Sequence, residues 1–256
     1  MDRIYFQNSR HLTLVGCFHE ADSTAAIVMA HGFTNDKSSQ GRFDQLAESF
    51  NRNGYNVLRF DFSGCGESAM DILSTHNMID DLRCAIEFMK KRSCTAIGLY
   101  GHSLGGLICL KCDDPAIRTM VLTGAPTDYM KYDWTEYYTD EQLREIRAKG
   151  YLTARDRSGN DRLIGRQILR SFEEINQKEF LGAIHCPVLL IHGNDPNDWE
   201  ETQLLEKSKK GINLLPVGSQ LEIIDGADHT FQDHLDRVIE RANDWYKRQL
   251  PLSSSV

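Results

Sequence analysis

Short, nearly uninterrupted runs of apolar residues recur along the chain, and they limit the fold more than any other feature. Five of them are TAAIVMAHGF (24–33), YNVLRFDFSG (55–64), TAIGLYG (95–101), RTMVLTGAP (118–126) and CPVLLIHG (186–193). Such runs are typical of strands buried on both faces of a sheet. The stretches between the first four carry apolar residues at helical spacing. This alternation predicts an α/β fold with a mostly parallel central sheet flanked by helices.

One internal segment departs from this alternation. Residues 127–182 contain no buried-strand run, are polar and helical in pattern, and are rich in tyrosine near their start. Residues 3–20, by contrast, alternate apolar and polar residues around a polar turn and predict an opening β-hairpin. We therefore expect one core formed by residues 1–126 and 183–256, with residues 127–182 inserted as a helical cap.

Composition and charge argue against several classes of partner. The 256-residue chain has a formal net charge of −8 and no basic run, so we do not expect it to bind nucleic acid. No apolar run approaches the roughly 20 residues of a membrane helix, and the N-terminus lacks a secretory signal pattern. Seven scattered cysteines, an odd number, argue against a disulfide framework and favour a cytoplasmic protein. Cys109 and Cys112 form a CxxC in a helix-like stretch, but no second Cys or His pair at ligand spacing accompanies it, so we expect no metal.

The segment YGHSLGG (100–106) has the features of a turn that exposes a nucleophile. It contains the pattern G-x-S-x-G, preceded by a strand-like run and followed by a helix-like run. In this context the serine occupies a strained turn above the sheet, and Gly101 and Gly105 leave room for that turn. We therefore predict that Ser103 is a nucleophile. The alternative is an inert serine in a tight turn.

A serine hydroxyl needs a base, and the order of residues after Ser103 indicates which histidine supplies it. In this type of site an acidic residue and then a histidine follow the serine. His229 lies in IIDGADHTF, after a strand-like run and a glycine, at the strand end where Ser103 emerges. His185 precedes its strand, His192 is expected to pack at the end of its strand, and His234 falls in the last helix. We predict that His229 is the general base.

The sequence leaves two residues open as the acidic partner. Asp195 and Asp198 both lie in IHGNDPNDWEE, the loop after the next-to-last strand. Either carboxylate, placed on the ring of His229, would orient the imidazole and stabilise its charged form. Asp228 adjoins His229, so its side chain is expected to diverge, and we interpret it as a loop residue.

Together these segments resemble the α/β-hydrolase superfamily of serine hydrolases over nearly the whole chain. HGF (31–33) resembles the family's oxyanion loop and DFSGCGES (61–68) its D-x-x-G-x-G-x-S turn. GHSLGG, HGNDP and GADHTF resemble its nucleophile, acid and histidine segments. Within the superfamily, the opening hairpin and the aromatic insertion are most similar to bacterial carboxylesterases of the feruloyl- or cinnamoyl-esterase type and to monoacylglycerol-lipase-like hydrolases.

The resemblance implies a triad of Ser103, an acid and His229, with the backbone N–H groups of Phe33 and Leu104 as the oxyanion hole. The family acid usually stands three residues after the glycine of H-G-x-x-D, where this chain has Pro196. A one-residue deletion aligns Asp195 with that acid, and a two-residue insertion aligns Asp198. We prefer Asp195.

The resemblance also implies hydrolysis of carboxylic esters through an acyl-enzyme on Ser103, without cofactor or metal. We expect a small-molecule substrate with a small acyl or an aromatic, cinnamoyl-type group. Four aromatic residues of the insertion either line its pocket or pack onto the core: Tyr132, Trp134, Tyr137 and Tyr138. Thioesterase, amidase or peptidase activity is the alternative with the same triad, and a non-catalytic binding protein is the alternative from another class. The oligomeric state is left undecided, with a homodimer as one option.

Overall fold

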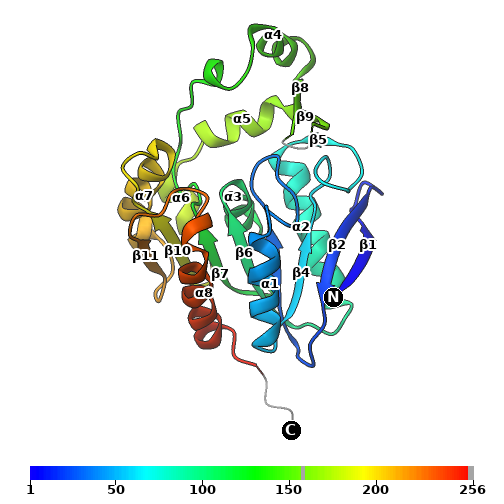
Figure 1. The fold of residues 1–256 in the computed structure, drawn as a ribbon, viewed down its shortest axis with the longest axis vertical. Coiled ribbons are helices and arrows are strands. Elements are labelled where there is room, and N and C mark those ends of the chain that lie inside the picture. Colours follow the sequence, from blue (N-terminus) through cyan, green and yellow to red (C-terminus); the bar gives the residue numbers. More distant parts are fainter. Residues whose placement is uncertain (157–158, 253–256) are drawn as a thin grey trace.

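A central eight-stranded sheet with helices on both faces organises the molecule, in a computed structural model that describes residues 1–156 and 159–252 (Figure 1). The strands lie in the order β1-β2-β4-β3-β6-β7-β10-β11. Their bounds are β1 Asp2–Gln7, β2 Thr13–His19, β3 Ala25–Ala30, β4 Asn56–Phe60, β6 Ala96–His102, β7 Ile117–Thr123, β10 Val188–Gly193 and β11 Gln220–Ile224. Strand β2 runs antiparallel to both β1 and β4, and the other neighbouring pairs are parallel. This confirms the predicted α/β fold and its opening hairpin.

The described residues form eight α-helices: α1 Arg42–Arg52, α2 Thr75–Lys90, α3 Leu104–Lys111, α4 Asp140–Lys149, α5 Arg166–Glu173, α6 Gln177–Gly182, α7 Trp199–Gly211 and α8 Leu235–Gln249. Short 3₁₀ turns lie between these helices, at η1 Trp134–Glu136, η2 Ile212–Leu214 and η3 Gln232–His234. Apolar side chains of α1 and α8 form one buried cluster with the sheet, and those of α2 and α3 form the other. The sheet is therefore covered on both faces.

Strand β3 is apolar at every position, and its packing shows why. Ala26 and Val28 belong to the core on the α2 and α3 side, whereas Ile27 and Met29 belong to the core on the α1 and α8 side. Successive side chains of a strand point to opposite faces of the sheet. Because both faces are covered, neither set of side chains can be polar without a buried partner.

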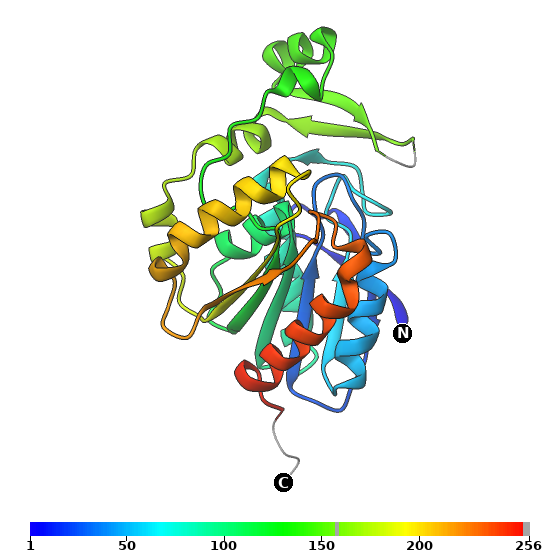
Figure 2. The same cartoon turned by 60° about the vertical axis from the view of Figure 1, so that its left-hand side comes forward.

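The segment 127–182 contains helices, as the sequence predicts, but also a β-hairpin that it does not predict. Strand β8 (Tyr151–Arg155) pairs antiparallel with β9 (Asp161–Gly165), and β9 pairs in parallel with the short β5 (Ile72–Leu73). These strands are short and only partly buried, so they leave no apolar run in the sequence. Figure 2 shows the hairpin and α4 standing above the central sheet. Residues 157–158 of this segment and 253–256 of the expected core lie outside the described residues.

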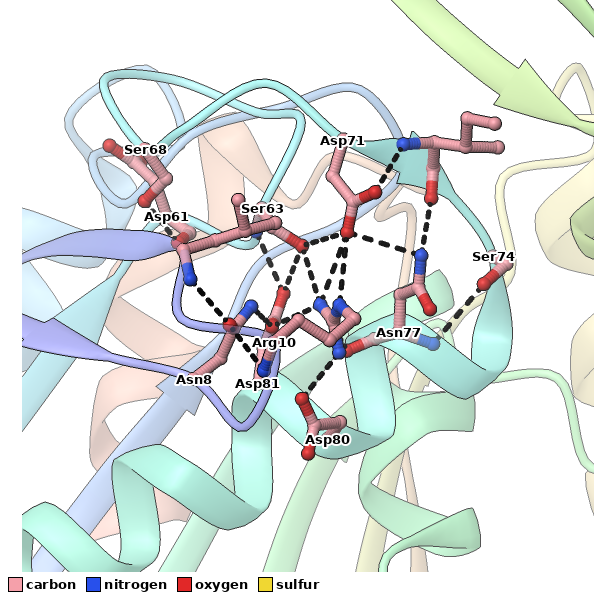
Figure 3. A network of polar contacts seen from close by, with 12 residues as sticks. Asn8, Arg10, Asp61, Ser63, Ser68, Asp71, Ser74, Asn77, Asp80 and Asp81 are labelled. Atoms are coloured by element: carbon pink, nitrogen blue, oxygen red, sulfur yellow. Dashed lines mark hydrogen bonds and ion pairs between the residues drawn. The ribbon is translucent and has the colours of Figure 1, made fainter.

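A polar network anchors the loop between β4 and α2 (Figure 3). Arg10, in the turn of the opening hairpin, donates to Asp71 (3.2 Å), Asp81 (2.8 Å), Asp80 and the hydroxyl of Ser63 (3.0 Å). Asp81 is fully buried, so its charge depends on these donors. The network holds in place a loop that packs next to the HGF segment.

Within residues 1–156 and 159–252, no helix combines the length and the apolar character that crossing a bilayer would need.

Candidate active site

Ser103 lies at the turn between β6 and α3, in the strand–turn–helix context that the sequence predicts. Its backbone has φ 55° and ψ −122°, a conformation that costs a non-glycine residue on the order of 1–3 kcal/mol. A Cβ atom on Gly105 would lie 2.1 Å from the carbonyl oxygen of Ala30, and one on Gly101 would lie 2.7 Å from the Cα of Gly106. Both glycines are therefore required by close packing, as the sequence predicts.

His229 reaches Ser103 from the loop after β11. Its Nε2 lies 2.9 Å from the Oγ of Ser103. Asp228 turns away and accepts the backbone N–H groups two and three residues further on, at 3.0 and 2.9 Å. The structure thus brings the predicted nucleophile and base together and confirms the interpretation of Asp228 as a loop residue.

The carboxylate on the ring of His229 belongs to Glu201, so the predicted acids are wrong. The Oε2 of Glu201 lies 2.6 Å from the Nδ1 of His229, and Glu201 is fully buried. Asp195 instead accepts the backbone N–H of Asn197 (2.9 Å) inside its own loop. The alternative, Asp198, holds the backbone rather than the ring: its Oδ2 accepts the N–H of His229 at 2.7 Å.

The start of helix α7 explains why Glu201 takes this position. Asp198 is the N-cap of α7, and its Oδ1 accepts the backbone N–H of Glu201 at 2.9 Å. Glu201 therefore stands in the first helical turn, where its side chain folds back onto the end of β10 and accepts the N–H of Gly193 (2.9 Å). The sequence D-W-E-E (198–201) has the D-x-x-E spacing of a helix start, and that signal would have drawn attention to Glu201.

The ionisation of Glu201 and that of His229 support each other. Burial favours a neutral Glu201, but His192 and His229 outweigh it and hold the pKa of this carboxyl well below its usual range. Burial likewise disfavours a charged His229, but the hydrogen bond and the charge of Glu201 raise the pKa of His229 above 6.5. Gly124 packs against the pair, since a Cβ there would lie 2.8 Å from His229 Nδ1. A hydroxyl, an imidazole and a carboxylate in this order can remove a proton from the serine.

The HGF segment packs against the nucleophile turn. A Cβ on Gly32 would lie 3.5 Å from the Cβ of Ser103. The buried His31 accepts the backbone N–H of Phe62 at Nε2 (3.2 Å), so its Nδ1 donates to the carbonyl of Gly32 (2.8 Å). Burial lowers the pKa of His31 and keeps this ring neutral. His31 thereby ties the HGF segment to the loop that Arg10 anchors.

The two predicted oxyanion donors flank Ser103. Leu104 is the first residue of α3, where a backbone N–H has no acceptor within the helix. Phe33 lines the same cavity as Ser103. In the part of the chain that the structure describes, neither N–H donates to a protein acceptor, so both are available to a bound group.

A cavity of about 220 Å³ opens above Ser103 and His229. Its walls include the four aromatic residues that the sequence predicts, Tyr132, Trp134, Tyr137 and Tyr138, together with Phe172 from the same inserted segment. The rings of Tyr132 and Trp134 are 4.9 Å apart, and the hydroxyl of Tyr132 donates to Glu200 at 2.6 Å. Cavities with such walls suit aromatic or short aliphatic groups.

A second, polar cavity of about 410 Å³ adjoins the first and shares Phe33, Asn35 and Gln40 with it. Most of the charged groups along it are paired, and the Asp36 carboxylate accepts the backbone N–H groups of Ser38 and Ser39. Arg162 contacts Asp156 at 2.6 Å, and Lys37, which lies beside it, contacts Glu67. The walls of this cavity are therefore polar and suit polar groups.

In the described residues, no three or more His, Cys, Asp or Glu side chains gather in a way that could hold a metal ion. The seven cysteines are free.

The chain is similar to known proteins in sequence as well as in fold. A family model described as "Serine aminopeptidase, S33" matches residues 21–151, which is just over half of the chain. The human "Protein ABHD12B" is 27% identical over 206 residues, which cover 76% of this chain. The match covers 51% of the human protein, so the chain spans about half the length of that relative.

Two solved structures illustrate the likeness in fold. The alpha/beta hydrolase GrgF from Penicillium sp. sh18 has a TM-score of 0.76 and 18% identity, over 97% of this chain and 98% of that one. Est1E from Butyrivibrio proteoclasticus, solved with ferulic acid bound, has a TM-score of 0.74 and 20% identity, over 96% and 99%. At these identities the likeness shows the fold, which is the α/β-hydrolase fold that the sequence predicts.

Proposed function

Because the chain belongs to the Serine aminopeptidase, S33, family of hydrolases, we propose that it is a serine esterase that cleaves carboxylic esters through an acyl-enzyme on Ser103. One observation carries this proposal. The Oγ of Ser103, the ring of His229 and the carboxylate of Glu201 form a continuous chain of contacts, at 2.9 and 2.6 Å, beside an aromatic cavity.

The proposed reaction begins when His229 removes the proton of Ser103 and the Ser103 oxygen attacks the ester carbonyl carbon. The N–H groups of Phe33 and Leu104 stabilise the resulting oxyanion, each by about 3 kcal/mol in the transition state. Glu201 stabilises the imidazolium of His229. The proton then passes to the leaving alcohol, and water releases the acid from the acyl-enzyme by the same route.

In this proposal each of the two cavities binds a different part of the substrate. Residues 127–182 act as a cap, and their aromatic side chains around Tyr132 hold a small acyl or a cinnamoyl-type acyl group. The adjoining cavity receives a neutral, polar alcohol part, because polar side chains line it and most of its charged groups are paired. The boundary of the cap and the role of its residues are parts of the proposal.

An aminopeptidase is the second candidate function. The matched family is described as serine aminopeptidase. In addition, the carboxyl group of Glu200 lines the aromatic cavity, and a negative charge there would attract a substrate ammonium group.

A substrate panel tests the proposal. p-Nitrophenyl acetate, butyrate and octanoate, methyl hydroxycinnamates, a thioester and alanine p-nitroanilide are compared for the wild type, Ser103→Ala and the exposed control Ser9→Ala. We expect ester cleavage, with kcat reduced at least about 10⁴-fold in Ser103→Ala and unchanged in Ser9→Ala. A wild type that is inactive on every ester, or a Ser103→Ala variant that is as active as the wild type, contradicts the proposal. Faster cleavage of the anilide than of any ester favours the aminopeptidase.

A further inference from the structure

A buried row of polar side chains lies behind Glu201, on the side away from Ser103. The Oε1 of Glu201 accepts the ring Nδ1–H of His192 at 2.8 Å and the backbone N–H of Gly193 at 2.9 Å. Its Oε2 faces His229 at 2.6 Å. Both Glu201 and His192 have no solvent exposure. Both oxygens of this carboxylate are therefore held by donors from different elements.

The row continues beyond His192. The Nε2 of His192 lies 2.9 Å from the hydroxyl of Ser208, which lies 3.0 Å from the hydroxyl of Thr127. Ser208 and Thr127 are also fully buried. Because an ionised carboxylate can only accept hydrogen bonds, the Nδ1 of His192 carries a hydrogen and donates it to Glu201.

We infer that His192 is a positioning residue, which holds the Glu201 carboxylate so that Oε2 faces the ring of His229. The inference rests on the proposed function and deepens it. A glutamate side chain has one more rotatable bond than an aspartate side chain. Holding the Glu201 carboxylate in one place therefore costs more side-chain conformational entropy. His192 stands at the end of β10 and Ser208 on α7. The row thus connects the sheet to the helix that carries the acid, and such outer partners orient the groups that react.

Other ionisable groups also act on His229 and must be kept constant in a test. Glu200 and Asp198, at the start of α7, raise the pKa of His229 together with Glu201. His102 of β6 lies with its ring 5.1 Å from the ring of His229, and burial lowers its pKa well below 6.5, so it stays neutral. A change at His192 alters none of these three residues directly.

Two substitutions at His192 separate positioning from packing. His192→Phe keeps a ring but removes both hydrogen bonds. His192→Asn keeps an N–H at the place of Nδ1 and loses only the contact with Ser208. We expect His192→Phe to lower kcat by about 10- to 100-fold, with KM within about twofold, and His192→Asn to recover most of that loss. His185→Asn, at an exposed histidine before β10, is the matched control.

The second readout does not depend on any substrate. NMR titration of the histidine rings, with His229 assigned from a His229→Gln spectrum, reports the pKa of His229 in each variant. If the carboxylate turns away without His192, the pKa of His229 falls toward 6.5 in His192→Phe and stays near the wild-type value in His192→Asn. The rate at which a fluorophosphonate labels Ser103 should follow the same order.

The outcomes distinguish the inference from the proposed function. An unchanged or higher His229 pKa in His192→Phe, or equal kcat in His192→Phe and wild type, overturns the inference. A wild type that is neither active on esters nor labelled at Ser103 overturns the proposed function, while the titration still tests the link between His192 and His229. If His192→Phe fails to fold in a thermal melt, Ser208→Ala replaces it. That variant should lower kcat by about threefold, and no change in kcat and His229 pKa overturns the inference.

Discussion

The turn that carries Ser103 and the segment that carries Glu201 serve the same histidine, but interactions of different range build them. Ser103 is placed by its immediate neighbours, because the strand before it, the helix after it and Gly105 define the turn. Glu201 is placed by the cap of α7 and by the end of β10. A local backbone requirement leaves a sequence pattern, whereas a contact between two distant elements leaves almost none.

Gly105→Ala should have the largest effect on the locally defined turn at Ser103. The new Cβ would lie 2.1 Å from the carbonyl oxygen of Ala30, and backbone atoms cannot move aside cheaply. We expect the free energy of unfolding to fall by about 3 kcal/mol or more, with loss of activity. Thermal and urea unfolding measure the change.

The matched control is Gly182→Ala, at an exposed position where the added Cβ would meet nothing within 4 Å. It should change the free energy of unfolding by less than about 0.5 kcal/mol. Equal effects of the two substitutions would show that close packing does not explain Gly105.

The pH dependence of kcat/KM tests the long-range contact between Glu201 and His229. His229 acts as a base only when neutral, and Glu201 raises its pKa above 6.5. Activity should therefore rise with pH, with the midpoint of the rise above pH 6.5, and Glu201→Gln should move that midpoint to lower pH. Rates from about pH 5 to about pH 9 test this, and a wild-type midpoint at or below 6.5 contradicts it.

Asp198→Ala should have a smaller effect than a change at Glu201, because Asp198 supports the site without touching the ring of His229. The substitution removes the N-cap of α7 and the 2.7 Å contact with the backbone of His229. We expect a loss of about 1–2 kcal/mol in the free energy of unfolding and about a tenfold loss in kcat/KM. Asp195→Ala is the control, and a larger effect there would reverse our ranking of the two aspartates.

Tyr132→Phe should have the smallest effect. It removes the 2.6 Å hydrogen bond to Glu200 and keeps the ring in the cavity wall. We expect KM for a methyl hydroxycinnamate to rise about two- to threefold with little change in kcat. Tyr129→Phe, at a residue with 52% exposure that does not line this cavity, is the comparison. A fall in kcat without a change in KM would argue against a binding role.

The same contrast explains what the sequence can and cannot predict. The buried strands and the turn at Ser103 follow from short patterns, because each depends on neighbouring residues. His229 lies 126 residues from Ser103, and its approach follows instead from the order of serine, acid and histidine along the chain. The β8–β9 hairpin is short and partly exposed, so it has no apolar run. The contacts of Glu201 with His229 and His192 depend on how α7 packs against β10, and only the helix-start spacing at Asp198 hints at them.

The most direct test of the central claim, that Glu201 is the acidic partner of His229, compares kcat for Glu201→Gln and Asp195→Asn on one ester. Both changes replace a carboxylate with an amide of the same shape. Loss of the acid should lower kcat by about 10³- to 10⁴-fold in Glu201→Gln, while Asp195→Asn stays within about twofold of the wild type. A collapse of kcat in Asp195→Asn, with Glu201→Gln near the wild-type value, would contradict the claim.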